Sequence, residues 1–79
     1  MERVVEGDVV EATIAVKFTR GQSVYHSTTI GRVIKQWTIK TMYGSQRIMT
    51  LDNGVSLFTI TPGDVHRKLS TLERSLMNL

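Results

Sequence analysis

The chain has 79 residues, of which 41% are hydrophobic and 22% are charged, with a formal net charge of +3 and no cysteine. This length and composition predict a single globular domain, residues 1–79, and the lack of cysteine excludes disulfides, a thiol nucleophile and thiolate zinc sites. No apolar run approaches the roughly 20 residues that cross a bilayer, and the acidic N-terminus is unlike a secretory signal. We therefore expect a cytoplasmic protein that does not contact a membrane.

Alternating apolar residues predict a first strand over residues 10–18. The residues on its apolar face are Val10, Ala12, Ile14, Val16 and Phe18. A period of two with β-branched residues is typical of a strand that is buried on one side. A second strand is expected over residues 32–42, after Gly31. The adjacent Val33 and Ile34 in it indicate either a bulge or a strand buried on both faces.

A third strand, residues 47–51, leads into Asp52-Asn53-Gly54. Asn-Gly supplies the positive φ angles that a type I′ hairpin turn requires. The returning strand is predicted at residues 55–61, so that all strands lie within residues 4–61. Leu51 and Val55 should then lie near each other across the hairpin.

Residues 62–78 are predicted to form one amphipathic helix. Thr61 suits the N-cap, Pro62 suits the first helical position, and Asp64 is placed to complete a capping box. The apolar residues that follow are Val65, Leu69, Leu72, Leu76 and Leu79, at intervals of 4, 3, 4 and 3 residues. This helical spacing predicts that their side chains cover the sheet.

The order of these features resembles that of the small Src-homology-3-like barrels, including KOW and Tudor modules. The matching segments are Glu6-Gly7-Asp8-Val9-Val10, Gly31-Arg32-Val33-Ile34, Leu51-Asp52-Asn53-Gly54 and Thr61-Pro62-Gly63-Asp64-Val65. They span most of residues 6–68, although the connection over residues 17–27 is long for that class. The expected fold is mainly β: a small antiparallel twisted sheet or a Src-homology-3-like barrel with one C-terminal amphipathic helix.

Signals for catalysis are poor. His26 and His66 are the only histidines and stand apart in the sequence, and no serine has the flanking residues of a nucleophile elbow. Metal-ligand clusters and phosphate-binding glycine motifs are also missing from the sequence. We therefore predict a non-enzymatic protein with no catalytic residues, no metal site and no cofactor.

The charges are segregated along the chain. Between Ala12 and Leu51 there are six basic residues and no acidic one, which gives that stretch a local charge of +6. Such a field attracts a polyanion or an acidic protein face. The first hypothesis is therefore a binding module that contacts nucleic acid, DNA or RNA, through a basic and aromatic sheet face. The candidate residues are Lys17, Arg20, Arg32, Lys35, Lys40, Tyr43 and Arg47.

The surface that these residues form depends on the second strand. With a bulge at Val33-Ile34, Arg32, Lys35 and Lys40 are expected to reach one surface. Tyr43, beside a turn glycine, is the ring expected to be exposed. The single tryptophan, Trp37, is expected in the core, because the chain has few other bulky aromatic residues. An ordinary solvated sheet exterior explains the same charges, since Lys and Arg also protect edge strands from aggregation.

The alternative hypothesis is a small viral or plasmid-type regulator that binds and modulates a larger host protein. The candidate partner-binding residues are Arg67, Lys68, Leu76 and Met77. Leu76 and Met77 widen the apolar stripe of the predicted helix, and a wide stripe on a small domain serves a partner or a homodimer. Simple capping of the core by the helix explains the same stripe.

Overall fold

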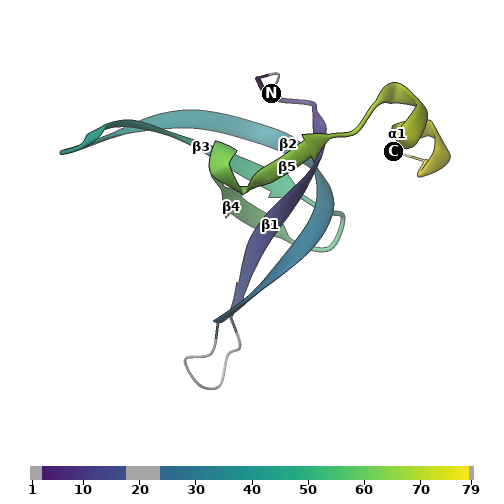
Figure 1. The fold of residues 1–79 in the computed structure, drawn as a ribbon, viewed down its shortest axis with the longest axis horizontal. Coiled ribbons are helices and arrows are strands. Elements are labelled where there is room, and N and C mark those ends of the chain that lie inside the picture. Colours follow the sequence, from purple (N-terminus) through teal and green to yellow (C-terminus); the bar gives the residue numbers. More distant parts are fainter. Residues whose placement is uncertain (1–2, 18–23, 79) are drawn as a thin grey trace.

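One five-stranded antiparallel sheet makes up most of the computed structural model, which describes residues 3–17 and 24–78 (Figure 1). The strands are β1 (Val9–Lys17), β2 (Val24–Thr41), β3 (Gly44–Asp52), β4 (Leu57–Ile60) and β5 (Val65–Lys68). A short 3₁₀ turn, η1 (Pro62–Asp64), joins β4 to β5, and helix α1 (Thr71–Leu76) follows. The order β4-β3-β2-β1-β5 leaves β4 and β5 at the edges of an open sheet. The predicted mainly β fold with a C-terminal helix is confirmed.

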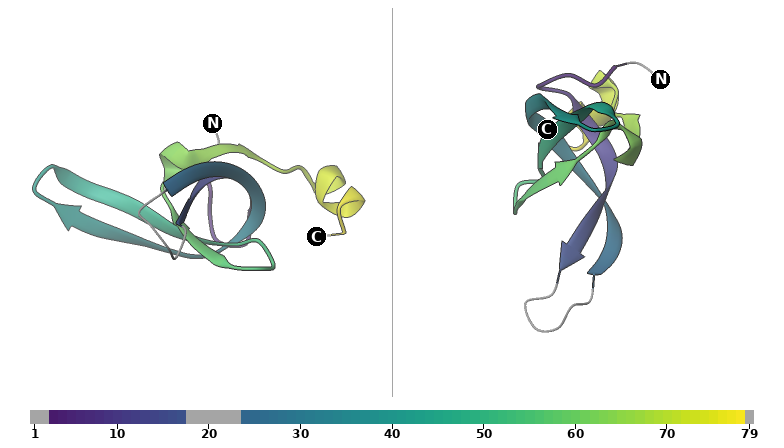
Figure 2. Two further views of the ribbon diagram at one scale, coloured as in Figure 1. Left: turned by 90° about the horizontal axis from the view of Figure 1, so that it is seen from below. Right: turned by 90° about the vertical axis from the view of Figure 1, so that its left-hand side faces the viewer.

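Strand β2 holds the sheet together because it pairs with two partners in succession. Its first part pairs with β1, from Val24 to Arg32, and its second part pairs with β3, from Arg32 to Thr41. The sheet curls where the partners change (Figure 2, left). Gly31 lies at that point, and a Cβ on it would lie 2.7 Å from the backbone oxygen of Asp52. The close approach of β3 therefore requires a glycine there.

The bulge expected at Val33-Ile34 is present. The register between β2 and β3 shifts between Val33 and Lys35, so Ile34 is the extra residue. Val33 is fully buried, whereas Ile34 is exposed, which rules out a strand that is buried on both faces at this point.

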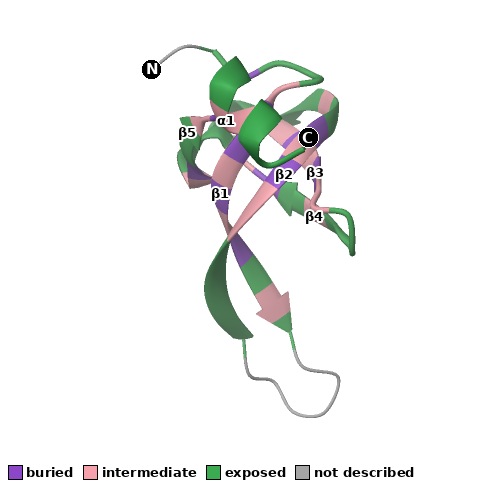
Figure 3. Ribbon diagram, turned by 90° about the vertical axis from the view of Figure 1, so that its right-hand side faces the viewer, coloured by how far each residue is buried: buried purple, intermediate pink, exposed green. Residues whose placement is uncertain are grey.

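The core lies where all five strands come together, and Figure 3 shows its buried residues in purple. The buried cluster consists of Val4, Val10, Ala12, Ile14, Val33, Met49, Leu51, Ile60 and Val65. Val10, Ala12 and Ile14 confirm the inward face predicted for the first strand. Phe18, which was expected to extend that face, lies outside the described residues.

Two pairs of strands extend beyond this core. β4 pairs with β3 only from Met49 to Asp52, so residues 34–48 of β2 and β3 form a two-stranded arm, called here the β2–β3 arm. β5 pairs with β1 only from Val10 to Ala12. Residues 13–17 and 24–28 therefore pair only with each other and form a second arm, the β1–β2 arm, whose base contributes Ile14 to the core. The β2–β3 arm and α1 lie at opposite ends of the molecule (Figures 1 and 2).

The predicted type I′ turn at Asn53-Gly54 is wrong. Gly54 has a φ of 90°, but among the described non-glycine residues only Asn78 has a positive φ, so Asn53 lacks the angle this turn requires. The connection instead runs over residues 53–56, because Asn53 Oδ1 accepts hydrogen bonds from the amides of Val55 and Ser56. Such bonds favour a longer turn. The register shifts with it, so that Leu51 pairs with Phe58 rather than with Val55.

The predicted helix over residues 62–78 is also wrong, as is the confinement of all strands to residues 4–61. The Thr61–Asp64 capping box is present, but it begins a 3₁₀ turn of three residues. Residues 65–68 then pair as β5 with the open edge of β1, which buries Val65. Tertiary pairing of this kind overrides a helical apolar period.

The actual helix begins at a different cap. Ser70 is the N-cap of α1, and it forms a capping box with Glu73. None of the six residues of α1, all of them described, is buried. Leu69, just before the helix, is buried, whereas Leu72 and Leu76 are exposed, so the expected cover of the sheet by the apolar stripe is not found.

Candidate nucleic-acid interface

The cross-strand register gives the β2–β3 arm two distinct faces. One face carries the fully buried Met49, which pairs with Gln36, and it continues the core side of the sheet. The other face is called here the outer arm face. It carries three cross-strand pairs: Lys35 with Thr50, Trp37 with Ile48, and Ile39 with Gln46. Because side chains alternate along a strand, Lys40 lies on the face opposite Lys35.

Lys35 and Trp37 form the centre of the outer arm face. The Lys35 ammonium nitrogen lies over the indole ring, 5.6 Å from its centroid. Trp37 is 36% exposed, so its expected position in the core is wrong. The bulge is the reason: without the extra residue Ile34, Trp37 would share the buried face of Val33. A shift of one residue turns every later side chain to the other face.

The structure brings only some of the candidate cations together. Arg32 and Lys35 lie on the same side of β2, whereas Lys40 lies on the other, so the expected common surface of all three is not formed. Lys17 is exposed near the end of the β1–β2 arm, away from the others. Arg20 lies outside the described residues.

Arg47 and Arg32 are engaged in the fold. The Arg47 guanidinium donates hydrogen bonds to the backbone oxygen of Val4 and, at 2.6 Å, to Gln36 Oε1. It thereby ties the N-terminal segment to the inner side of the arm. Arg32 Nη1 donates to the backbone oxygen of Gly7 at 3.1 Å, and Arg32 pairs across the strands with Asp52. Both arginines are thus less available to a ligand than Lys35.

The tip of the arm carries the second exposed ring. Met42 and Tyr43 form the turn between β2 and β3, and Tyr43 is 93% exposed, as expected from the sequence. The Thr41 hydroxyl fixes this turn, since it donates to the backbone oxygen of Gly44 and accepts from the Tyr43 amide. The exposed ring therefore stands on an ordered turn.

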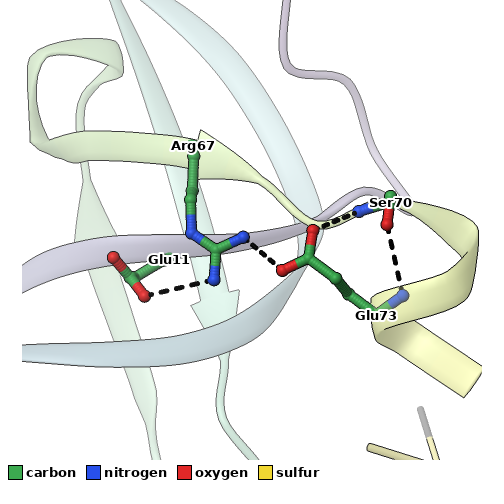
Figure 4. Close-up of polar contacts among 4 residues, drawn as sticks. All are labelled: Glu11, Arg67, Ser70 and Glu73. Carbon is green, nitrogen blue, oxygen red and sulfur yellow. Dashed lines mark hydrogen bonds and ion pairs between the residues drawn. The ribbon is translucent and has the colours of Figure 1, made fainter. Parts of the chain in front are cut away.

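The acidic side chains that form ion pairs lie at the opposite end of the molecule, whereas Glu6 Oε1 accepts a hydrogen bond from the backbone amide of Gln36 in the arm at 3.0 Å. Asp8 Oδ2 lies 3.3 Å from the Lys68 ammonium, and Arg67 bridges Glu11 and Glu73 (Figure 4). The ion pairs within residues 3–17 and 24–78 all involve Arg67 or Lys68. These two candidate partner-binding cations are therefore neutralised, whereas the lysines of the β2–β3 arm have no acidic partner among the described residues.

The Arg67–Glu73 contact also fixes α1. The hydrogen bond from Arg67, followed by the backbone amide of Ser70, lowers the pKa of Glu73, and the same hydrogen bond raises the pKa of Arg67. The Ser70 hydroxyl accepts from the Glu73 amide at 3.2 Å, which completes the contact shown in Figure 4. These contacts fix the position of α1, although none of its side chains is buried.

We expect α1 to lose this anchor in acid. A carboxyl group whose pKa is lowered by folding stabilises the fold above its unfolded pKa, and this contribution disappears as the pH falls through the folded pKa. Amide hydrogen exchange at Arg74 and Met77, which donate within α1, should accelerate as the pH falls below about 4.5, relative to the intrinsic rate of the unfolded chain. In a Glu73→Gln variant the exchange should be faster than in the natural protein near neutral pH and should not accelerate further below about pH 4.5, because the amide keeps the capping box but has no charge to lose. Equal protection in both proteins near neutral pH would contradict this role of Glu73.

Comparisons with protein-family models, with curated proteins and with solved structures found no match. The resemblance to Src-homology-3-like barrels therefore stays a prediction, beside the observed open antiparallel sheet. Within the described parts of the chain, no three His, Asp or Glu side chains gather as a metal ion would require. None of the helices in those parts is long and apolar enough to cross a membrane.

Proposed function

We propose that this protein is a non-enzymatic binding module that contacts nucleic acid through the outer face of its β2–β3 arm. The supporting observation is the Lys35–Trp37 pair, an ammonium over an exposed ring on an arm without acidic residues. A lysine without an acidic partner attracts phosphate, and an exposed aromatic ring offers a surface for bases. The arm thus presents both kinds of contact on one face.

The distribution of charge supports the arm over the C-terminal end. Residues 34–48 include Lys35, Lys40 and Arg47 and no carboxylate. At the other end, Arg67 and Lys68 face Asp8, Glu11 and Glu73. The lysines of the arm therefore have no acidic partner within the described parts of the chain, which favours the arm over the C-terminal end as the site that attracts a polyanion.

Titration against labelled oligonucleotides tests this proposal. Fluorescence anisotropy should show binding at about 20 mM salt that weakens steeply toward physiological salt, because phosphate contacts release counterions. The dissociation constant at physiological salt should lie near 10⁻⁴–10⁻⁶ M, the range of binding without sequence specificity. Absence of binding to single and double strands alike at the lowest salt would refute the proposal.

A second candidate function rests on α1. Leu72 and Leu76 are 69% and 79% exposed, and Met77 is also exposed, so this helix offers an apolar surface to a larger protein. A viral or plasmid-type regulator that docks by α1 would bind its host protein with no need of the arm. Loss of that complex in a Leu76→Ser variant, with an intact complex in a Lys35→Gln variant, would favour this function. A molar mass that rises with concentration in light scattering would instead indicate a homodimer.

A further inference from the structure

We infer that the ligand of the outer arm face is a single strand of nucleic acid, with a base stacked on Trp37 and a phosphate on Lys35. This inference rests on the proposed function and names its ligand class. The faces of unpaired bases are open to an aromatic ring, whereas in a duplex they are covered by neighbouring bases. DNA and RNA share this chemistry, since stacking and phosphate contact do not need the 2′-hydroxyl.

The position of Lys35 allows its ammonium to move from the Trp37 ring to a phosphate when a base binds. Its ammonium lies over the Trp37 ring at 5.6 Å, and within the described residues it has no ion pair. A base that approaches the ring displaces this ammonium from the ring and meets a flexible cation beside it. The lysine then moves to the phosphate of the incoming nucleotide, which exchanges a cation–π contact for a charge pair.

The apolar residues around Trp37 argue against a duplex. A two-stranded arm has the width to enter a major groove, but reading that groove needs hydrogen-bonding side chains that reach base edges. The centre of the outer arm face instead places Ile48 opposite Trp37 and Ile39 two residues further along, and its polar side chains Thr50 and Gln46 lie on either side of this apolar centre. The apolar centre offers contact to the flat faces and sugars of splayed nucleotides and no hydrogen bonds to base edges.

The tip extends the path of the strand. Tyr43 lies six residues beyond Trp37, which amounts to about 15–20 Å along the arm. Both rings are exposed, and each is available for stacking. A strand that runs along the arm from Trp37 to Tyr43 thus stays on a two-ring platform, so a probe of about eight nucleotides is adequate.

The chain reports on this contact directly, because Trp37 is its only tryptophan. We would titrate the protein with an eight-nucleotide oligo-dT, with the matching oligo-rU, and with an abasic deoxyribose-phosphate strand of the same length and charge. Oligo-dT and oligo-rU should quench Trp37 fluorescence and bind about tenfold more tightly than the abasic strand. A duplex of mixed sequence and about 20 base pairs, which stays paired at low salt, should leave the fluorescence unquenched.

Two variants separate stacking from charge, and their binding is measured by the anisotropy of labelled strands because they lack the only tryptophan. Trp37→Leu keeps an apolar side chain at this exposed position and should remove the preference for the strand with bases, while its binding stays salt-dependent. Trp37→Phe keeps a ring and should retain the preference. If the natural protein binds abasic and oligo-dT strands equally well without quenching, or if it prefers the duplex, this inference is wrong. The proposed binding of polyanions by the arm would then still stand. Absence of binding to every probe at low salt would instead refute the proposed function itself. Circular dichroism checks that both variants are folded.

Discussion

A Gly31→Ala substitution should lower the free energy of unfolding by about 3 kcal/mol. The added Cβ would lie 2.7 Å from the Asp52 backbone oxygen and 2.9 Å from Leu51 Cγ. The first of these atoms belongs to a paired strand, so relief requires β2 and β3 to move apart next to the buried Val33 and Leu51. For a domain of this size, the thermal midpoint should fall by more than about 10 °C.

Gly63→Ala is the matched control. A Cβ on Gly63, in η1, has its nearest neighbour at 3.8 Å, which is ordinary contact. This variant should melt within a few degrees of the natural protein. Thermal denaturation of both variants by circular dichroism makes the comparison. A Gly31→Ala protein as stable as the Gly63→Ala protein would show that β2 and β3 do not approach each other as closely at Gly31 as they do in this structure.

The second large effect is expected on binding. Lys35→Glu should weaken binding to an oligonucleotide by at least about tenfold at low salt, because it removes one phosphate contact and adds repulsion. The slope of the logarithm of the affinity against the logarithm of the salt concentration should decrease in magnitude by about one, which corresponds to one phosphate contact. Anisotropy titrations over a series of salt concentrations measure both quantities.

Lys40→Glu is the control for this effect. It changes the net charge by the same amount on the same arm, but from the opposite face. Its loss of affinity should be clearly smaller, because only the long-range field changes. Equal losses in the two variants would mean that the arm attracts polyanions without using its outer face.

Much of the sheet could be predicted from local patterns. The alternation from Val10 to Ile14 gave the buried face of β1, and the Val33-Ile34 pair indicated the bulge. The C-terminal part could not be predicted in the same way. The apolar spacing from Val65 to Leu76 fits a helix, but the open edge of β1 pairs with Val65–Lys68. That edge is a property of the assembled sheet and has no local signature in residues 62–78.

The candidate site was predicted in part. Lys35 and Tyr43 are exposed as expected, but the exposure of Trp37 was missed. The sequence did indicate the bulge at Val33-Ile34. An extra residue at Ile34 reverses the faces of the side chains that follow it, and this places Trp37, three residues later, on the exposed face. The engagement of Arg47 with Val4 joins residues 43 positions apart, and no local pattern indicates such a contact.

A ¹H–¹⁵N NMR titration of the natural protein with an eight-nucleotide oligo-dT tests most directly whether the outer arm face is the binding surface. We predict that the largest shift changes occur at Lys35, the Trp37 indole, Ile48 and Tyr43. Changes that cluster instead on α1 or on the β1–β2 arm would contradict it, and so would a spectrum that does not change at low salt.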